Sequence, residues 1–169
     1  MPSGDADPGS ALRLRGPLVV GIVVTVLALD QATKAWAVSS LAHEPTSIIG
    51  TTVEFRLSRN PGSAFSLFQT LTPLLAVVAV GIALMLVRAM RRTDDQIVIV
   101  ALALVLAGAF GNLADRLFRS PGWLRGAVVD FIHVGRFPTF NVADSAITIG
   151  AVLLVGWTLL GNRSRTRES

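Results

Sequence analysis

Four stretches of apolar residues constrain the fold of this chain more than any other feature of its sequence. They lie at about 17–38, 74–90, 97–114 and 142–160. Each is close to the roughly 20 residues that a helix needs to cross a bilayer core of about 30 Å. Charged residues make up only 15% of the chain, against about 25% in soluble domains. The sequence therefore predicts an all-α integral membrane protein with four transmembrane helices.

Basic residues near the ends of these segments predict how the chain crosses the membrane. Eight lie in short flanks on one side and seven in two longer connections on the other, so the count alone does not decide. The compact flanks suit the cytoplasmic side under the positive-inside rule. We expect cytoplasmic tails at 1–16 and 161–169, one membrane domain at 17–160, and extracytoplasmic connections at 39–73 and 115–141.

The first apolar segment has a second interpretation, as a cleavable signal peptide. Arg13 and Arg15 precede its apolar run, and Ala35-Trp36-Ala37 follows as a cleavage site would. Asp30 and Lys34 are unsuited to the end of such a segment. We therefore expect it to be retained as a transmembrane helix.

Some classes of function are excluded by residue types that the chain lacks. It has no cysteine, which removes disulfides and thiolate nucleophiles. Its two histidines, His43 and His133, are too few for a usual zinc site and lie outside any HExxH arrangement. The basic residues form no stripe beyond the membrane flanks, which argues against nucleic-acid binding. We expect neither a metal nor another cofactor.

Unusual polar residues gather where the predicted helices meet the outer side of the membrane. Helices that alternate in direction bring the ends of the first and third to that side, together with the starts of the second and fourth. The polar positions are Asp30, Lys34, Asn60, Asn112, Asp115, Arg116, Asp130, Asn141 and Asp144. A carboxylate in or beside hydrocarbon costs free energy, so each of the four aspartates is a candidate for function.

Most of these residues also have a purely structural interpretation. Asp30 and Lys34 are four residues apart on one helix face and suit an ion pair. Asp115 and Arg116 suit another ion pair at the membrane interface. Asp144 suits a cap at the start of the fourth helix, and the three asparagines suit turns or caps.

Asp130 differs, because it lies in the apolar run 128–132 with no capping pattern and no neighbouring base. If a re-entrant stretch brings it near Asp144, two like charges in a poorly hydrated site share one proton. The ionised carboxylate can take a proton from water while the protonated one hydrogen-bonds the carbonyl of a peptide. This pattern predicts peptide hydrolysis without a metal or a thiol.

Five motifs give the chain a resemblance to a known family. They are DQATK at 30–34, NPGSAF at 60–65, GNLADR at 111–116, VVDF at 128–131 and FNVADS at 140–145. In this order they resemble the lipoprotein signal peptidases, or type II signal peptidases, of bacteria over about residues 17–160. Each motif is weak alone, whereas five in sequence are specific.

The resemblance implies an intramembrane aspartyl protease of the bacterial cytoplasmic (inner) membrane, with its active site toward the extracytoplasmic side. It implies cleavage of prolipoproteins before a cysteine that carries a diacylglyceryl group, and inhibition by lipopeptide antibiotics. The catalytic pair maps onto Asp130 and Asp144. The surrounding polar residues map onto Asp30, Lys34, Asn60, Asn112, Arg116 and Asn141, and Asp115 is a further supporting candidate.

The family also carries a small β-rich cradle outside the membrane after its first helix, and the alternating residues 52–57 fit a strand of it. The chain departs from the family between its motifs. The connection from Arg116 to Asp130 is several residues longer than usual, and the stretch from Asp130 to Asp144 is short. Asp115 therefore remains the second choice as the partner of Asp144.

The main alternative function is that of a proton-coupled transporter or a channel subunit, since intramembrane aspartates also mark ion pathways. Such a pathway needs polar residues through the whole membrane depth. The second and fourth segments have almost none beyond their outer ends. As partners we expect membrane lipids and lipid-modified prolipoproteins but no nucleic acid, and we expect the protein to be a monomer.

Overall fold

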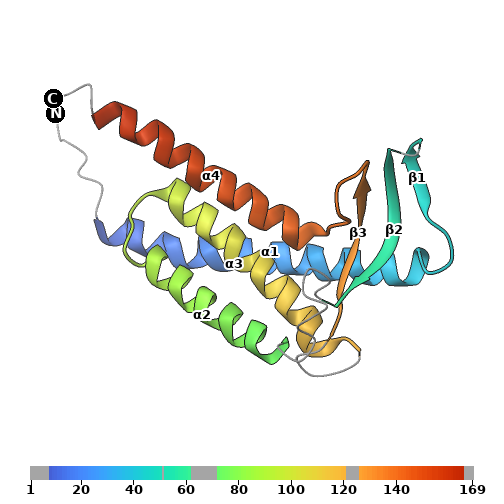
Figure 1. Ribbon diagram of the computed structural model, residues 1–169. Helices are drawn as coiled ribbons and strands as arrows, with labels where there is room; N and C mark the ends of the chain where they lie inside the picture. Colours follow the sequence, from blue (N-terminus) through green and yellow to red (C-terminus); the bar gives the residue numbers. More distant parts are fainter. Residues whose placement is uncertain (1–7, 51, 62–71, 121–125, 166–169) are drawn as a thin grey trace.

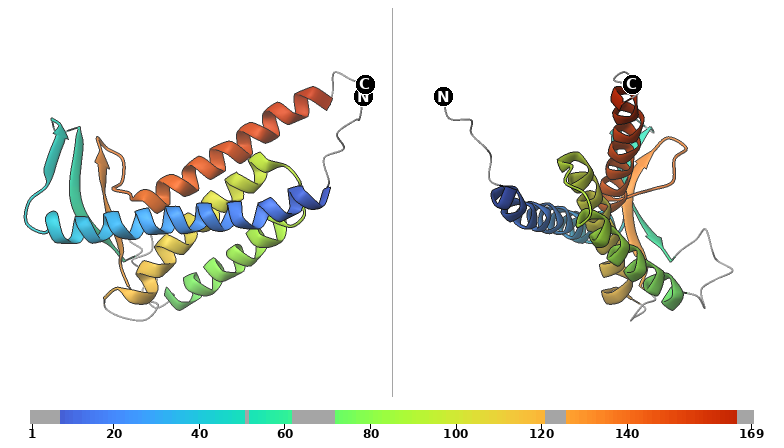
Figure 2. Two further views of the ribbon diagram at one scale, coloured as in Figure 1. Left: turned by 180° about the vertical axis from the view of Figure 1, so that it is seen from behind. Right: turned by 90° about the vertical axis from the view of Figure 1, so that its left-hand side faces the viewer.

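The computed structural model describes residues 8–50, 52–61, 72–120 and 126–165. In this part of the chain the helices are α1 (Pro8–Ser40), α2 (Thr72–Met90), α3 (Gln96–Phe118) and α4 (Val142–Arg165). The strands are β1 (Thr46–Ile49), β2 (Val53–Asn60) and β3 (Val128–Val134). The helices form an elongated bundle, and the strands form a small sheet beside the C-terminal end of α1 (Figure 1). The start of α1 and the end of α4 lie at the opposite end of the bundle (Figure 2).

Within the described residues, three helical stretches are long and apolar enough to cross a membrane. They are Gly16–Ser40, Gln96–Phe118 and Val142–Leu160. The described apolar part of α2, Val80–Met90, is shorter. Large apolar side chains point away from the bundle, and Leu84 and Val152 are 67% and 65% exposed. Such exposed apolar surface is stable in lipid and not in water, so the chain is a membrane protein.

The helices extend beyond the apolar segments that the sequence predicts. α1 begins at Pro8, well before the apolar segment expected from about residue 17, and contains Pro17 in its interior. The missing N–H of Pro17 removes one backbone hydrogen bond there. α4 continues to Arg165, into the predicted tail. Hydropathy marks only the part of a helix that suits lipid, so it does not show where the helix itself begins and ends.

The sheet is antiparallel with the order β1-β2-β3. β2 confirms the strand expected within 52–57, but β3 was not predicted, because a re-entrant stretch was expected around Asp130. Val128 to Phe131 are all buried, as in a strand that is covered on both faces. Such a strand shows no alternation of apolar and polar residues. In the register of the two strands, Ser58 lies opposite Asp130.

The end of α1 fixes the sheet to the bundle. Ala37 of α1 and Leu41, which directly follows that helix, form a buried apolar cluster with Val129 and Phe131 of β3. The ring of Trp36 meets that of Phe131 edge-on, with 6.0 Å between the ring centroids. Aromatic pairs of this kind contribute about 0.5–1.5 kcal/mol beyond the burial of their area. The position of β3, and hence of Asp130, is thus set by α1.

α3 packs closely against the first turns of α4 because a glycine removes a side chain from the contact. A Cβ added at Gly108 would overlap the backbone oxygen of Ala143 and approach Cγ1 of Ile147 to 2.7 Å. Small residues at helix contacts allow two backbones to come close together. This contact positions the start of α4, which carries Asp144.

We predict that Gly108→Ala lowers the free energy of unfolding by about 1–3 kcal/mol, because the added methyl group forces α3 and α4 apart. Thermal unfolding of the purified protein in detergent measures the effect. Gly156→Ala in α4 is the matched control, since a Cβ there meets nothing within 4 Å, and we expect no loss. Equal destabilisation by both substitutions would contradict the close contact.

Candidate active site

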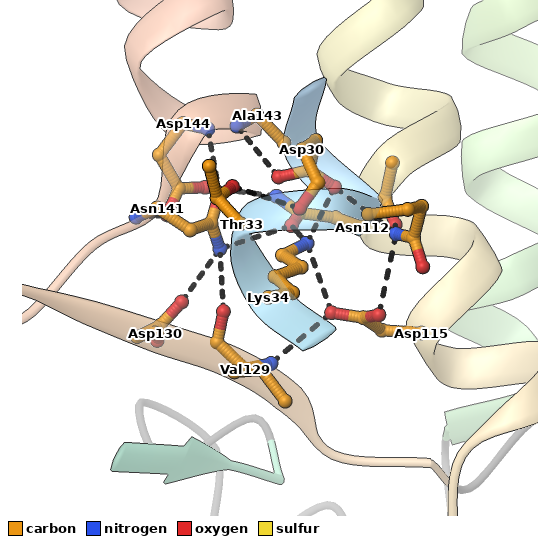
Figure 3. Close-up of polar contacts among 12 residues, drawn as sticks. Asp30, Thr33, Lys34, Asn112, Asp115, Val129, Asp130, Asn141, Ala143 and Asp144 are labelled. Atoms are coloured by element: carbon orange, nitrogen blue, oxygen red, sulfur yellow. Dashed lines mark hydrogen bonds and ion pairs between the residues drawn. The ribbon is translucent and has the colours of Figure 1, made fainter. Parts of the chain in front are cut away.

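A fully buried group of charges joins α1 to α3 (Figure 3). Lys34 Nζ lies 2.9 Å from a carboxylate oxygen of Asp30 and 2.9 Å from one of Asp115, and none of these side chains has exposed area. It also donates a hydrogen bond to Oδ1 of Asn112 at 3.1 Å. All three donors of the ammonium group are therefore satisfied, which a buried cation requires. The ion pair predicted from the spacing of Asp30 and Lys34 is confirmed.

Asp115 and Arg116 contact different groups, which corrects the expected ion pair between them. Asp115 binds Lys34 and, at 2.6 Å, Nε of Arg119. Arg116 donates to the backbone oxygen of Asn112 at 3.3 Å. Adjacent positions of a helix do not face each other, whereas positions four apart do. Arg119, which sequence analysis missed, had this signal in its spacing from Asp115.

Arg116 is placed between several carboxylates. Its positive charge is attracted by Asp115, Asp130 and Asp144. The guanidinium group cannot lose its proton in proteins. It therefore supplies a permanent positive charge beside the candidate pair.

Asn141 directly precedes α4 and forms hydrogen bonds with both aspartates of the predicted pair. Its Oδ1 accepts from the backbone N–H of Asp144 at 2.9 Å, and a carboxylate oxygen of Asp144 accepts from the backbone N–H of Asn141 at 3.2 Å. This reciprocal arrangement is a capping box, so Asp144 has the capping role that its position suggested. Nδ2 of Asn141 donates to Oδ1 of Asp130 at 2.6 Å. One amide side chain thus ties β3 to the start of α4.

Asp144 has a second carboxylate oxygen, which lies outside the capping box. That oxygen, Oδ1, accepts a hydrogen bond from Nδ2 of Asn112 at 2.8 Å. The amide oxygen of Asn112 in turn accepts from Lys34 and from Asn141. The orientation of Asp144 is therefore fixed from α3 and from its own helix.

Asp130 is buried on β3, with 3% of its area exposed. Burial raises the pKa of its carboxyl group to about 6, and the negative charge of Asp144 adds to this rise. Hydrogen bonds from Asn141 and Asn60 and the positive charge of Lys34 oppose the rise without cancelling it. A carboxyl group of this kind holds its proton nearer to neutral pH than an exposed one.

Among the described residues of the site, negatively charged groups outnumber positively charged groups by one. Four carboxylates, Asp30, Asp115, Asp130 and Asp144, are accompanied by three cations, Lys34, Arg116 and Arg119. A single proton bound to the pair of Asp130 and Asp144 makes the group neutral.

All nine polar residues predicted from the sequence lie at one end of the bundle. A connected network contains Asp30, Lys34, Asn60, Asn112, Asp115, Asp130, Asn141 and Asp144, with Arg116 beside it. The lengthened connection after Arg116 lies partly outside the described residues. Sequence analysis missed two backbone N–H groups, those of Val129 and Ala143, which bind Asp115 and Asp30.

The raised pKa of Asp130 has a consequence for stability. Above about pH 6 the folded protein contains a buried charge that the unfolded chain exposes to water, so stability rises as the pH falls through 6 toward 3.8. We predict that Asp130→Asn stabilises the protein at pH 7.5 by up to about 3 kcal/mol. This gain should fade by pH 4.

Thermal unfolding of both proteins at pH 7.5 and pH 4 measures this difference. A variant that is less stable than the parent at pH 7.5, or a gain of the same size at both pH values, would contradict the raised pKa.

In comparisons with known proteins, the matching family model and the similar relatives agree with one another. The family model for signal peptidase (SPase) II matches residues 22–160. The chain is 48% identical over 161 residues to the lipoprotein signal peptidase of Rhodococcus jostii, covering 95% of this chain and 81% of that protein. It is 45% identical over 159 residues to the lipoprotein signal peptidase of Mycolicibacterium smegmatis, covering 94% and 68%.

Two solved structures of bacterial membrane enzymes have the same fold. One, determined at 2.3 Å, matches with a TM-score of 0.76 and 29% identity, covering 90% of this chain and 93% of the other. A second, determined at 1.9 Å, matches with a TM-score of 0.73 and 30% identity, covering 85% and 93%.

Proposed function

This chain belongs to the signal peptidase II family, and from that premise we propose that it is an intramembrane aspartyl endopeptidase. It removes signal peptides from prolipoproteins by cleaving before the diacylglyceryl-modified cysteine. Asp130 and Asp144 form its catalytic pair. The observation that carries this proposal is the link through Asn141, which hydrogen-bonds Asp130 directly and Asp144 through the capping box.

The environments of the two carboxyl groups suit opposite roles. Asp130, with its raised pKa, holds the shared proton. Asp144 takes the role of the base, and hydrogen bonds from Asn112 and from the backbone of Asn141 orient its oxygens. Neighbouring titratable groups with different environments are the usual basis for assigning an acid and a base.

Hydrolysis then proceeds without a covalent enzyme intermediate. Asp144 removes a proton from a water molecule, whose oxygen bonds to the scissile carbonyl carbon. Asp130 donates its proton toward the carbonyl oxygen, which yields a neutral tetrahedral intermediate. The C–N bond breaks as the nitrogen takes the proton that Asp144 holds, and the proton on the former carbonyl oxygen returns to Asp130. The pair again holds one proton, and Arg116 offsets negative charge as it develops.

The location of the pair suits a substrate that carries lipid. It lies at the end of helices long enough to span the membrane, where two acyl chains would hold a modified cysteine at the interface. A cavity of about 280 Å³ opens beside Asp144 and is lined in addition by Phe137, Phe140, Ser145, Thr148 and Ile149. This mostly apolar cavity would admit the substrate from the lipid side of α4.

The proposed topology has four membrane spans, with α2 as the second and both termini in the cytoplasm. The tails at 1–16 and 161–169 then lie in the cytoplasm, and the sheet and the catalytic pair lie toward the extracytoplasmic side of the membrane. The same site would bind lipopeptide antibiotics, and the protein would act as a monomer. Membership of a peptidase family favours this function over proton-coupled transport.

We predict that Asp130→Asn and Asp144→Asn each lower the rate of cleavage at least about 10³-fold, because catalytic groups that act as a unit fail together. The assay follows a diacylglyceryl-modified precursor peptide with purified protein in detergent, and thermal unfolding confirms that each variant is folded. An active Asp130→Asn together with an inactive Asp115→Asn would identify Asp115 as the partner of Asp144.

The acid role of Asp130 predicts a pH dependence. Because the protonated form is required, kcat/KM should fall as the pH rises through about 6, approaching a tenfold loss per pH unit at higher pH. Initial rates at low substrate concentration and constant ionic strength, from pH 4.5 to 8.5, measure this fall in kcat/KM. A kcat/KM that rises steadily to pH 8 would contradict the assignment.

A further inference from the structure

The two proposed catalytic aspartates lie on different elements, and each follows a residue whose backbone is held by a buried carboxylate. The N–H of Val129, directly before Asp130, donates to Oδ2 of Asp115 at 3.1 Å. The N–H of Ala143, directly before Asp144, donates to Oδ1 of Asp30 at 3.0 Å. Both acceptors are fully buried side chains from other helices, α3 and α1.

Lys34 connects these two carboxylates. Its Nζ contacts Oδ2 of Asp115, the same oxygen that accepts from Val129, and also Oδ2 of Asp30, each at 2.9 Å. A continuous series of polar contacts therefore runs from the backbone of β3 through Asp115, Lys34 and Asp30 to the backbone of α4. Figure 3 shows Lys34 at the middle of this series.

We infer that Asp30, Lys34 and Asp115 form a brace that fixes the separation of Asp130 and Asp144, with Lys34 as a positioning residue at its centre. The inference rests on the proposed function for the catalytic role of the two aspartates. The brace itself consists of contacts between described residues. It assigns to Lys34 a role beyond the ion pair with Asp30 that its spacing predicts.

A role in stability alone does not account for this arrangement. Apolar residues of similar volume are often as stabilising as a buried ion pair, so burial gives no reason for these charges to be present. Both ends of the series meet a backbone N–H adjacent to a catalytic aspartate. Gly111 of α3 makes the space that Asp30 occupies, because a Cβ added there would lie 2.6 Å from Oδ2 of Asp30.

The brace predicts a defect in turnover and not in substrate affinity. Lys34→Met keeps the length of the side chain but removes its charge and its donors. A displacement of about 1 Å in a catalytic group costs about 10²-fold in rate. We expect kcat per folded molecule to fall about a hundredfold, while KM for a diacylglyceryl-modified peptide changes less than about threefold.

Hydrogen–deuterium exchange gives a readout that does not depend on activity. In Lys34→Met, peptides that contain the amides of Val129 and Ala143 should exchange faster than in the parent protein. Leu106→Ala is the matched control, because Leu106 lies in a separate apolar cluster between α2 and α3. We expect it to lower the unfolding temperature while kcat and exchange at Val129 and Ala143 stay unchanged.

Two results would overturn the brace. One is Lys34→Met with the kcat of the parent, and the other is a lowered kcat with unchanged exchange at both amides, which would show that Lys34 acts through its charge. If Lys34→Met does not fold, Asp30→Asn replaces it, because it removes the negative charge that pairs with Lys34 and weakens the acceptor of the Ala143 N–H. Faster exchange at Ala143 with a lowered kcat supports the brace, whereas parent values for both overturn it.

These outcomes are separate from a failure of the proposed function. A parent protein that leaves the lipid-modified peptide intact contradicts the proposed function. The exchange measurement still tests the brace in that case.

Discussion

A buried ammonium group must be surrounded by hydrogen-bond acceptors. The acceptors around Lys34 come from two helices, and they also bind two further elements. Asp30 comes from the same helix one turn earlier, whereas Asp115 and Asn112 come from α3. Those partners in turn hold the backbones of β3 and α4. The site therefore forms only when α1, α3, α4 and the sheet are all in place.

Asp130 illustrates the opposite condition, a buried charge without full compensation. Neighbouring groups lower the cost of its ionised form, yet burial and Asp144 keep its pKa at about 6. Loss of stability at a functional site is a common result of selection for activity. The well-compensated group around Lys34 thus lies beside the under-compensated Asp130. We propose that the first holds the site in place and the second takes part in its chemistry.

Much of this arrangement can be predicted from the sequence, because hydropathy reveals apolar helices and four-residue spacing reveals the pairing of Asp30 with Lys34. The strand β3 could not be recognised in the sequence, because an apolar run that is buried on both faces lacks the alternation of apolar and polar residues typical of a strand. The partner of Asp115 was wrongly expected to be Arg116, because adjacency in sequence is not adjacency on a helix. The N–H groups of Val129 and Ala143 could not be found at all, since every residue but proline carries one.

We propose that Asp130 and Asp144 share one proton, with Asp130 as its holder. Infrared spectroscopy of the purified protein at pH 5, in which the carboxylic-acid C=O stretch marks a protonated carboxyl group, tests this directly. We predict that Asp130→Asn removes the band of one buried carboxylic acid that is present in the parent protein. An unchanged spectrum in that variant, or the loss of the band only in Asp144→Asn, would contradict the account.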